Sequence, residues 1–274
     1  MARIRGTLRS AAKRVYEEIL WGRVWLAGTI DRVLSKERPL PASVPPTAVL
    51  GRSEQVEAAI QEAKTLGLPL HPDRPKNWDS IGAVGVVLRR FGHQARVLDV
   101  GAARYSVPLP WLRIFGLSDL LGINLEFGRP TRHGPVLFRH GDAIATGVPD
   151  ASIDAVLCMS VIEHGVPIED FLAESARILR QGGLLCVSTD YDQEPPPTDG
   201  LIAYDVPVRI FGPADVRHLI DEAQGLGLHL VGDLQLEHEE RPVEWKRFGL
   251  RYTFILLTFE RNETNRPAGD PSAR

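Results

Sequence analysis

The chain has 274 residues, of which 43% are hydrophobic and 24% are charged, and its formal net charge is −3 at pH 7. This composition is typical of a globular protein with a buried core, and the slight negative charge excludes a protein that works mainly by neutralising nucleic-acid phosphates. No apolar run reaches the ~18 residues of a membrane-spanning helix, and the first residues lack the apolar stretch of a signal peptide. We therefore expect a cytoplasmic protein, with Cys158 and Cys186 as buried, reduced thiols.

Residues 1–75 are predicted to form a helical extension with a proline-rich linker. Apolar residues at helical spacing form one stripe along its first part, made of Ile4, Leu8, Ala11, Val15, Ile19, Leu26, Ile30 and Val33. Basic residues share the polar face, with no acid before Glu17. The first helix therefore either lies on an anionic membrane, with Trp21 and Trp25 at the interface, or docks on protein, including a second copy of the chain.

The rest of the extension contains a linker and a second helix. Four prolines between residues 39 and 46 predict an extended or mobile segment, because proline lacks the amide that a helix needs. Residues 53–66 then have the composition of a helix, with Ser53 as its N-cap.

Residues 76–261 are predicted to form an α/β domain, because short apolar runs alternate with helical segments. The runs, each typical of a strand buried on both faces, are residues 97–100, 120–123, 136–138, 155–159, 184–187, 228–234 and 252–259. Helices are expected at residues 81–91, 171–180 and 213–224. This alternation predicts a Rossmann-like, doubly wound, mostly parallel seven-stranded sheet. The polar residues 262–274 are predicted to be a disordered tail.

Polar residues gather after five of these strands. They comprise Asp99 to Ser106, Asn124, Gly141–Asp142, Ser160 to His164, and Ser188 to Asp192. Ligands of open parallel sheets bind at the carboxyl ends of the strands, where the strand order reverses. Gly101 lets a ligand approach the backbone, and Asn124 lies near the position where such folds place a ribose-binding acid. We therefore predict a nucleotide-type site at this edge.

Four segments make the prediction more specific. Arg96–Gly101, Gly141–Ala143, Ile153–His164 and Glu174–Gly183 resemble the successive motifs of class I S-adenosylmethionine (SAM)-dependent methyltransferases. The likeness is greatest to the ubiquinone-biosynthesis type, and it covers residues 77–260. The resemblance implies SAM as the cofactor and a last strand antiparallel to the others.

The resemblance also implies which residues hold the cofactor. The positions are Asp99 and Gly101 with Ala102 at the methionine part, Asn124 with Leu125 at the ribose, Asp142 and Ala143 at the adenine, and Ser160 beside the sulfonium. Two positions depart from the family pattern. Gly101 is followed by Ala102-Ala103-Arg104 instead of further glycines, and Asn124 replaces an acid. Asparagine loses a charge-assisted hydrogen bond, so the alternative is a catalytically degenerate domain that binds SAM or another nucleotide without methyl transfer.

The candidate catalytic residues are His164, Glu163 and Asp190. The ordinary pKa of histidine lies near operating pH, so His164 is our first candidate for a base that deprotonates an acceptor hydroxyl. Glu163 and His164 are equally expected to cap the next helix, and Trp78 either covers the cofactor or packs in the core.

These observations predict an O-methyltransferase for a small-molecule or glycan-like acceptor. The N-terminal helices and residues 209–222 are expected to shape the acceptor pocket. A third hypothesis is a nicotinamide-dependent oxidoreductase, which needs Gly-x-Gly-x-x-Gly after the first predicted strand, and this chain lacks that motif. No metal site is predicted, because the histidines lack ligand spacing.

Overall fold

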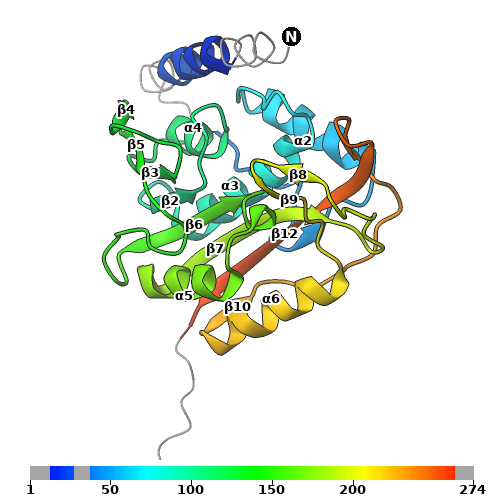
Figure 1. Cartoon of the computed structure of the whole chain (residues 1–274). Coiled ribbons are helices and arrows are strands. Elements are labelled where there is room, and N and C mark those ends of the chain that lie inside the picture. The colour runs from blue at the N-terminus through cyan, green and yellow to red at the C-terminus, as the bar shows by residue number, and fades with distance from the viewer. Residues whose placement is uncertain (1–12, 28–37, 263–274) are drawn as a thin grey trace, which may run out of the picture.

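One sheet passes through the molecule in the computed structural model, which describes residues 13–27 and 38–262 (Figure 1). Its five central strands are parallel: β2 (Arg96–Val100), β3 (Asp119–Asn124), β5 (Val136–His140), β6 (Ile153–Met159) and β7 (Leu179–Tyr191). The last long strand, β12 (Leu250–Arg261), runs antiparallel beside β7. The order β12-β7-β6-β2-β3-β5 confirms the doubly wound prediction and places the reversal of strand order between β2 and β6.

Shorter strands extend this sheet. β10 (Leu228–Leu230) is the remaining predicted strand and pairs with β12. The sequence did not predict the short strands β1 (Ala48–Val49), β4 (Thr131–His133) and β11 (Val243–Trp245), or the separate hairpin of β8 (Ile202–Ala203) and β9 (Val206–Pro207). Strands of two or three residues are too short to show an alternating pattern.

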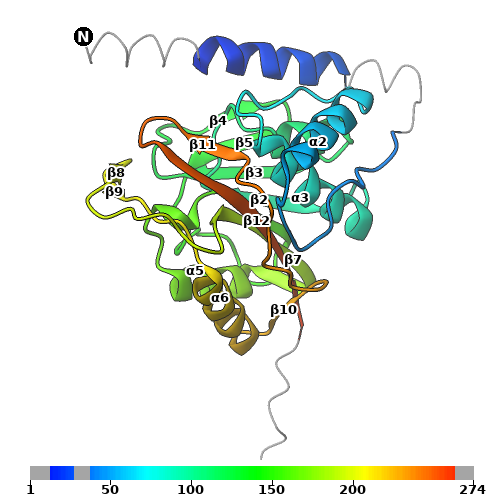
Figure 2. The same ribbon diagram turned by 90° about the vertical axis from the view of Figure 1, so that its right-hand side faces the viewer.

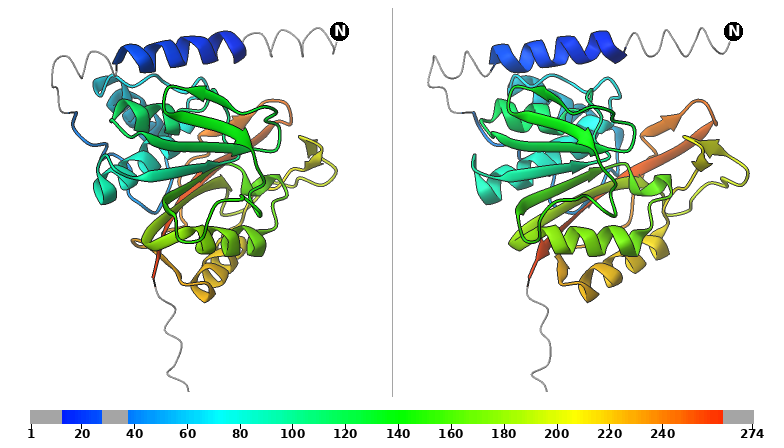
Figure 3. Two further views of the ribbon diagram at one scale, coloured as in Figure 1. Left: turned by 90° about the vertical axis from the view of Figure 1, so that its left-hand side faces the viewer. Right: turned by 60° about the vertical axis from the view of Figure 1, so that its left-hand side comes forward.

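Helices cover both faces of the sheet (Figures 1 and 3). One face carries α2 (Ser53–Thr65), α3 (Lys76–Phe91) and α4 (Pro108–Ile114), and the other carries α5 (Ile168–Ile178) and α6 (Pro213–Gly225). Along β6, Leu157 packs with the first group and Cys158 with the second. The strands are therefore apolar on both faces. Both cysteines are buried and free, as predicted.

Several predicted boundaries are wrong, and three of them bear on the site. α3 begins at Lys76, five residues before the predicted start, so its first turns contain polar residues that the apolar pattern did not include. α5 ends at Ile178 and β7 begins at the next residue, so Gly182, with a φ of +71°, lies within the strand near a register shift and not in a separate turn. β7 also continues to Tyr191, so Asp190 lies inside it.

The proline-rich linker is packed and not mobile. Val44 is buried, and a Cβ on Gly82 of α3 would lie 2.7 Å from its side chain. A Cβ on Gly85 would lie 2.8 Å from the Pro41 carbonyl oxygen. Because these two helical glycines have no side chain, the extended linker lies directly against α3.

The described part of the N-terminal helix, residues 13–27, lies across one end of the molecule (Figure 2). Leu20, Trp21 and Val24 are buried against the domain, whereas Val15 and Ile19 of the predicted apolar stripe are each 56% exposed. The Trp21 ring stacks on His133 at 4.6 Å, so its predicted place at a membrane interface is wrong. The predicted tail falls almost wholly outside the described residues. None of the described helices is long and apolar enough to cross a bilayer.

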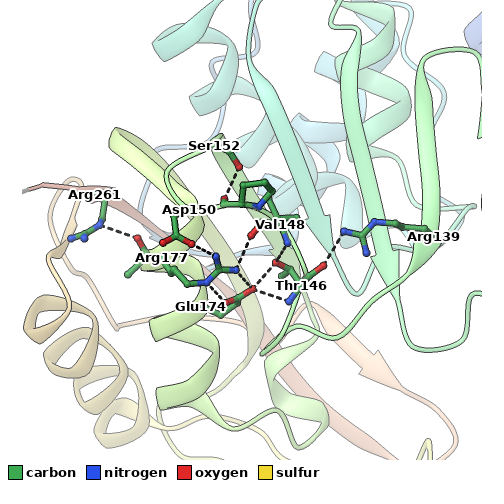
Figure 4. A network of polar contacts seen from close by, with 10 residues as sticks. Arg139, Thr146, Val148, Asp150, Ser152, Glu174, Arg177 and Arg261 are labelled. Atoms are coloured by element: carbon green, nitrogen blue, oxygen red, sulfur yellow. Dashed lines mark hydrogen bonds and ion pairs between the residues drawn. The ribbon is translucent and has the colours of Figure 1, made fainter.

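An ionic network fixes the loop after β5 to α5 (Figure 4). Glu174 Oε1 accepts hydrogen bonds from the Thr146 amide at 2.8 Å and from its hydroxyl at 2.6 Å, while Arg177 donates to both Glu174 oxygens at 2.8 Å. Arg177 also bonds to the Val148 carbonyl at 2.8 Å and to Asp150. Burial alone would raise the pKa of Glu174, but the hydrogen bonds from Arg177 and Thr146 lower it to about 2.

We expect Glu174→Gln to lower the free energy of unfolding by about 2 kcal/mol at pH 7, because the folded state then loses the ionised acceptor. The pKa of Glu174 is lower in the folded than in the unfolded chain, so its stabilisation is complete above about pH 5 and is lost as the pH falls toward 2. Urea denaturation should therefore show a smaller difference at pH 3 than at pH 7. Glu57→Gln, which breaks an exposed pair with Arg74, is the control and should change stability by less than about 1 kcal/mol. An equal loss in both variants would contradict the assignment.

Candidate functional site

The first element of the site is the carboxyl end of β2. Asp99 is only 2% exposed, no described residue donates a hydrogen bond to its carboxyl, and burial raises its pKa to about 8. A buried carboxyl of this kind needs a cationic or hydrogen-bond-donating partner to be stable when ionised. Its environment therefore fits a ligand that carries an ammonium group, as SAM does.

The turn after β2 depends on a single glycine. Gly101 has a φ of +70°, and a Cβ there would lie 2.4 Å from the Val161 side chain. The following loop is then tied to β3, because the Asn124 amide donates to the Ala102 carbonyl at 3.0 Å. One glycine is enough here because the loop packs on Val161 from one side and is held by Asn124 from the other.

Asn124 ends β3 and is only partly available to a ligand. Its Oδ1 accepts a hydrogen bond from the Glu126 amide at 2.8 Å, in addition to the bond that its Nδ2 donates to the loop. One N–H and one lone pair remain. The next residue, Leu125, is 63% exposed. The guanidinium of Arg104 lies over the Phe127 ring at 4.8 Å, and its buried Nε has no hydrogen-bond partner among the residues that the structure describes.

The loop after β5 contains the residues predicted at the adenine. Asp142 Oδ1 accepts a hydrogen bond from the Ile144 amide at 3.2 Å, so its second oxygen is not used by the described residues. Ala143 packs at the edge of the core formed with α5 and α6. The Glu174 network holds the end of this loop at Thr146 (Figure 4). The structure therefore brings both predicted residues to the same sheet edge as Asp99.

Ser160 follows β6 and has a φ of +54°, an uncommon conformation for a residue with a side chain. Its amide donates to the Ser188 carbonyl at 2.9 Å, and its hydroxyl accepts a hydrogen bond from the Lys76 ammonium. Lys76 Nζ also lies 4.1 Å from the centroid of the Phe254 ring. Lys76 thus places a positive charge between the ends of β6, β7 and β12.

Two buried carboxyls lie beside this charge. Glu163 is 2% exposed and accepts a hydrogen bond from the Thr189 hydroxyl at 3.1 Å. Asp190 is 5% exposed and accepts one from the Tyr252 hydroxyl. Burial and then the nearby Asp190 raise the pKa of Glu163 to about 8, and burial raises the pKa of Asp190 to about 6, opposed by Lys76 and Tyr252. Near pH 7 such a pair holds one proton and one negative charge.

His164 lies on the rim of this region, at the end of the short 3-10 helix Ile162–His164. Its ring packs edge-to-face on Tyr204 at 5.0 Å, and burial together with Lys76 lowers its pKa. α5 begins after Pro167 without a side-chain cap, and the Glu163 carboxyl contacts β7. Neither Glu163 nor His164 therefore caps α5.

A third buried carboxyl belongs to α3, and the sequence did not single it out. Asp79 is 0% exposed and accepts hydrogen bonds from Ser188 at 2.7 Å and Ser80 at 3.2 Å. Burial raises its pKa. The signal that could have found Asp79 and Lys76 is two charges on a helix whose next twelve residues are mostly apolar. Tyr252 could be found only from the pairing of β12 with β7.

Other predicted residues lie in the core. Trp78 is 1% exposed and packs with α2 and α4, which supports the packing alternative. Tyr191 is completely buried, and its hydroxyl donates to the Leu236 carbonyl at 2.8 Å, so it does not face the site. In the described part of the chain, no group of three or more histidine, cysteine or acidic side chains is placed to hold a metal ion.

Sequence comparison matches residues 98–187 to the family described as "Methyltransferase domain". A probable S-adenosylmethionine-dependent methyltransferase of Mycolicibacterium smegmatis is 43% identical over 116 residues, which are 38% of this chain and 42% of that protein. A demethylmenaquinone methyltransferase of Deinococcus radiodurans is 34% identical over 115 residues, which are 39% of this chain and 46% of that protein. The aligned region thus spans less than half the length of these curated relatives.

Solved structures share the fold at low identity. Geranyl diphosphate C-methyltransferase from Streptomyces coelicolor is 16% identical, with a TM-score of 0.50 over 77% of this chain and 84% of that chain. The cyclase SpnF is 15% identical, with a TM-score of 0.51 over 83% of this chain and 99% of that chain. The matched segment includes β2, the Asp142 loop, Ser160 and most of β7. Residues 98–187 are therefore similar to a methyltransferase domain, and S-adenosylmethionine is the cofactor that this similarity indicates.

Proposed function

We propose that this chain transfers the methyl group of SAM to a hydroxyl of a small-molecule or glycan-like acceptor. The observation that carries the proposal is the buried Glu163–Asp190 pair, which lies next to the switch in strand order and close to Asp99. Glu163 and Asp99 both act electrostatically on the Cys158 thiol between them. A base is needed when the acceptor is a hydroxyl, and Asp190 lies near the sheet edge at which we expect SAM to bind.

The cofactor half of the site is formed by Asp99, Gly101, Asn124 and Asp142. Asp99 would accept the ammonium of the methionine part, Asn124 would bond the ribose with its remaining N–H, and Asp142 would bond the adenine amine with its free oxygen. Ala102, Ala143, Leu125 and Ser160 would line the same surface. When bound, SAM supplies an electrophilic methyl group on its sulfonium.

Asp190 is the proton acceptor in this proposal. Its ionised form is favoured by the Tyr252 hydroxyl and the Lys76 ammonium, while Glu163 retains the shared proton. With SAM bound, Asp190 would accept the proton of the acceptor hydroxyl as that oxygen takes the methyl group, and the demethylated product would be the leaving group. The burial of Asp190 keeps water away from its carboxyl, so the proton of the acceptor hydroxyl passes to Asp190 and not to solvent. His164, neutral because its pKa is lowered, packs on Tyr204 at the rim and is not the base in this proposal.

We infer a hydroxyl acceptor from the Glu163–Asp190 pair of this chain and not from the substrates of its relatives. The names of the relatives and structural neighbours include a quinone-ring substrate and a C-methyltransferase, so a quinol and an isoprenoid diphosphate belong beside hydroxyl compounds in any acceptor screen. Incubation with labelled SAM and cell extract tests the proposal directly. We place the reaction in the cytoplasm, which agrees with two free thiols.

A second candidate is a domain that binds SAM without turnover. Asn124 supports it, since this side chain already makes two hydrogen bonds within the protein. Calorimetry with SAM, with its demethylated product and with NADH separates these candidate functions. Binding of SAM without methyl transfer to any acceptor favours the second candidate, and absence of binding to SAM and product overturns both.

Asp99 gives a prediction with a thermodynamic readout. Its pKa of about 8 means that most of the carboxyls carry a proton at pH 7 in the free protein. The ammonium of bound SAM favours the ionised form, so binding should release close to one proton per SAM. Calorimetry in buffers of different ionisation enthalpy measures this release.

Asp99→Asn should abolish the proton release and weaken SAM at least tenfold. The folded-state pKa is raised, so the ionised carboxyl destabilises the free protein increasingly from about pH 4 up to about pH 8. The variant should therefore melt no lower than the wild type at pH 7. Asp119→Asn, at the opposite end of β3 in a pair with Arg96, is the control and should leave SAM affinity unchanged. Unchanged proton release in Asp99→Asn would exclude this assignment.

The base assignment predicts that Asp190→Asn lowers kcat roughly 10²- to 10⁴-fold while SAM affinity stays within about twofold. The wild-type rate should rise with pH through about 6, because Asp190 must be ionised to accept a proton. His164→Gln should retain most of kcat. The reverse result, loss in His164→Gln and near wild-type turnover in Asp190→Asn, would make His164 the base.

A further inference from the structure

The N-terminal helix presents its most regular apolar stripe away from the protein. Val15 and Ile19 are each 56% exposed, and Leu26 is 52% exposed. These residues lie on one face of the helix because they are four and seven positions apart. Trp25, at the border of this face, is 72% exposed. Large apolar side chains gathered on one exposed helix face indicate an interaction surface.

The inner face is already occupied. Trp21 Nε1 donates to the Arg104 carbonyl at 3.1 Å, and Lys13 Nζ lies 4.6 Å from the centroid of the Tyr105 ring. The helix is therefore fixed on the domain by one side, next to the loop that follows Gly101. Figure 2 shows it lying flat across this end of the molecule, with its opposite side directed outward.

Charge on this helix differs in sign from the rest of the chain. Within residues 13–27, the described part of the helix, the basic residues Lys13, Arg14 and Arg23 outnumber the acids Glu17 and Glu18, whereas the whole chain has a formal net charge of −3. Of the two acids, Glu17 faces inward, with its carboxylate 3.5 Å from His133 Nε2, while Glu18 is exposed. Arg14 and Arg23 flank the exposed apolar stripe. An apolar face bordered by arginines and a tryptophan complements an anionic lipid surface.

A second copy of the chain fits this face less well. One side of a 15-residue helix, ~22 Å long and about 10 Å wide, offers roughly 200 Å². A stable dimer buries about 800 Å² on each partner. A lipid surface does not require a buried area of that size.

We propose that the outer face of the N-terminal helix binds the surface of anionic phospholipid membranes. Val15, Ile19 and Leu26 enter the interface between headgroups and acyl chains, Trp25 lies at its border, and Arg14 and Arg23 contact lipid phosphates. The helix lies in the plane of the membrane and does not span it. This proposal does not depend on methyl transfer, so it can fail or succeed separately from the proposed function.

The test is sedimentation of the full chain with vesicles of phosphatidylglycerol and phosphatidylcholine, compared with vesicles of phosphatidylcholine alone. We expect binding to the anionic vesicles, reduced by 0.5 M salt, with a blue shift of tryptophan fluorescence that Trp25→Phe removes. Ile19→Glu should lower the bound fraction about tenfold or more, because it places a charge in the apolar stripe. Arg14→Glu with Arg23→Glu should weaken anionic binding alone.

The matched control is Leu40→Glu, the same kind of change at a residue that is 41% exposed elsewhere on the domain. It should bind vesicles like the wild type, and thermal melting of both variants should stay unchanged. Absence of binding to anionic vesicles, or equal loss in both variants, would overturn the proposal. So would a dimer in analytical ultracentrifugation that Ile19→Glu dissociates without any effect on vesicles, since this face would then belong to a second copy.

Discussion

Burial of carboxyl groups at one edge of an apolar sheet is the constraint on which the rest of this structure depends. Asp99, Asp79, Glu163 and Asp190 are each at most 5% exposed, and burial raises the pKa of all four. Ionised carboxyls in such places are costly unless a cation or a donor compensates them. Lys76 supplies one cation from α3, and Tyr252 supplies a donor from β12. No described residue gives Asp99 such a group, so its carboxyl is largely protonated at pH 7 and its ionised form would be favoured by a cationic ligand.

The sequence was sufficient for the central sheet because its strands are buried on both faces. Uniformly apolar runs such as residues 155–159 have few alternatives once helices separate them. The ends of elements were less predictable. α3 starts at Lys76 because polar side chains of its first turn bond to the loop before it, as with Asn77, which donates to the carbonyls of His71 and Arg74. Local propensity does not record such contacts.

The residues of the site also differ in how well the sequence predicted them. Asp99, Asn124, Asp142 and Glu163 were predictable because each closely follows or ends a strand, and the topology of a parallel sheet brings strand ends together. Lys76 and Tyr252 were not predictable, since they enter through a helix start and an antiparallel strand. The outward face of the N-terminal helix has a related cause. Periodicity shows that Val15 and Ile19 share a face, but Trp21, outside that stripe, determines which face meets the protein.

The loop after β2 shows how a departure from a family pattern is compatible with the same fold. Several glycines would allow this loop many conformations, whereas here two of the three residues after Gly101 are held by hydrogen bonds from other elements. Ala102 is bonded by Asn124, and the Arg104 carbonyl accepts a hydrogen bond from Trp21 of the N-terminal helix. Fewer conformations in the free state reduce the entropy lost on binding a ligand. The same contacts connect the loop to the N-terminal helix, so the order of the helix and the shape of the cofactor edge depend on each other.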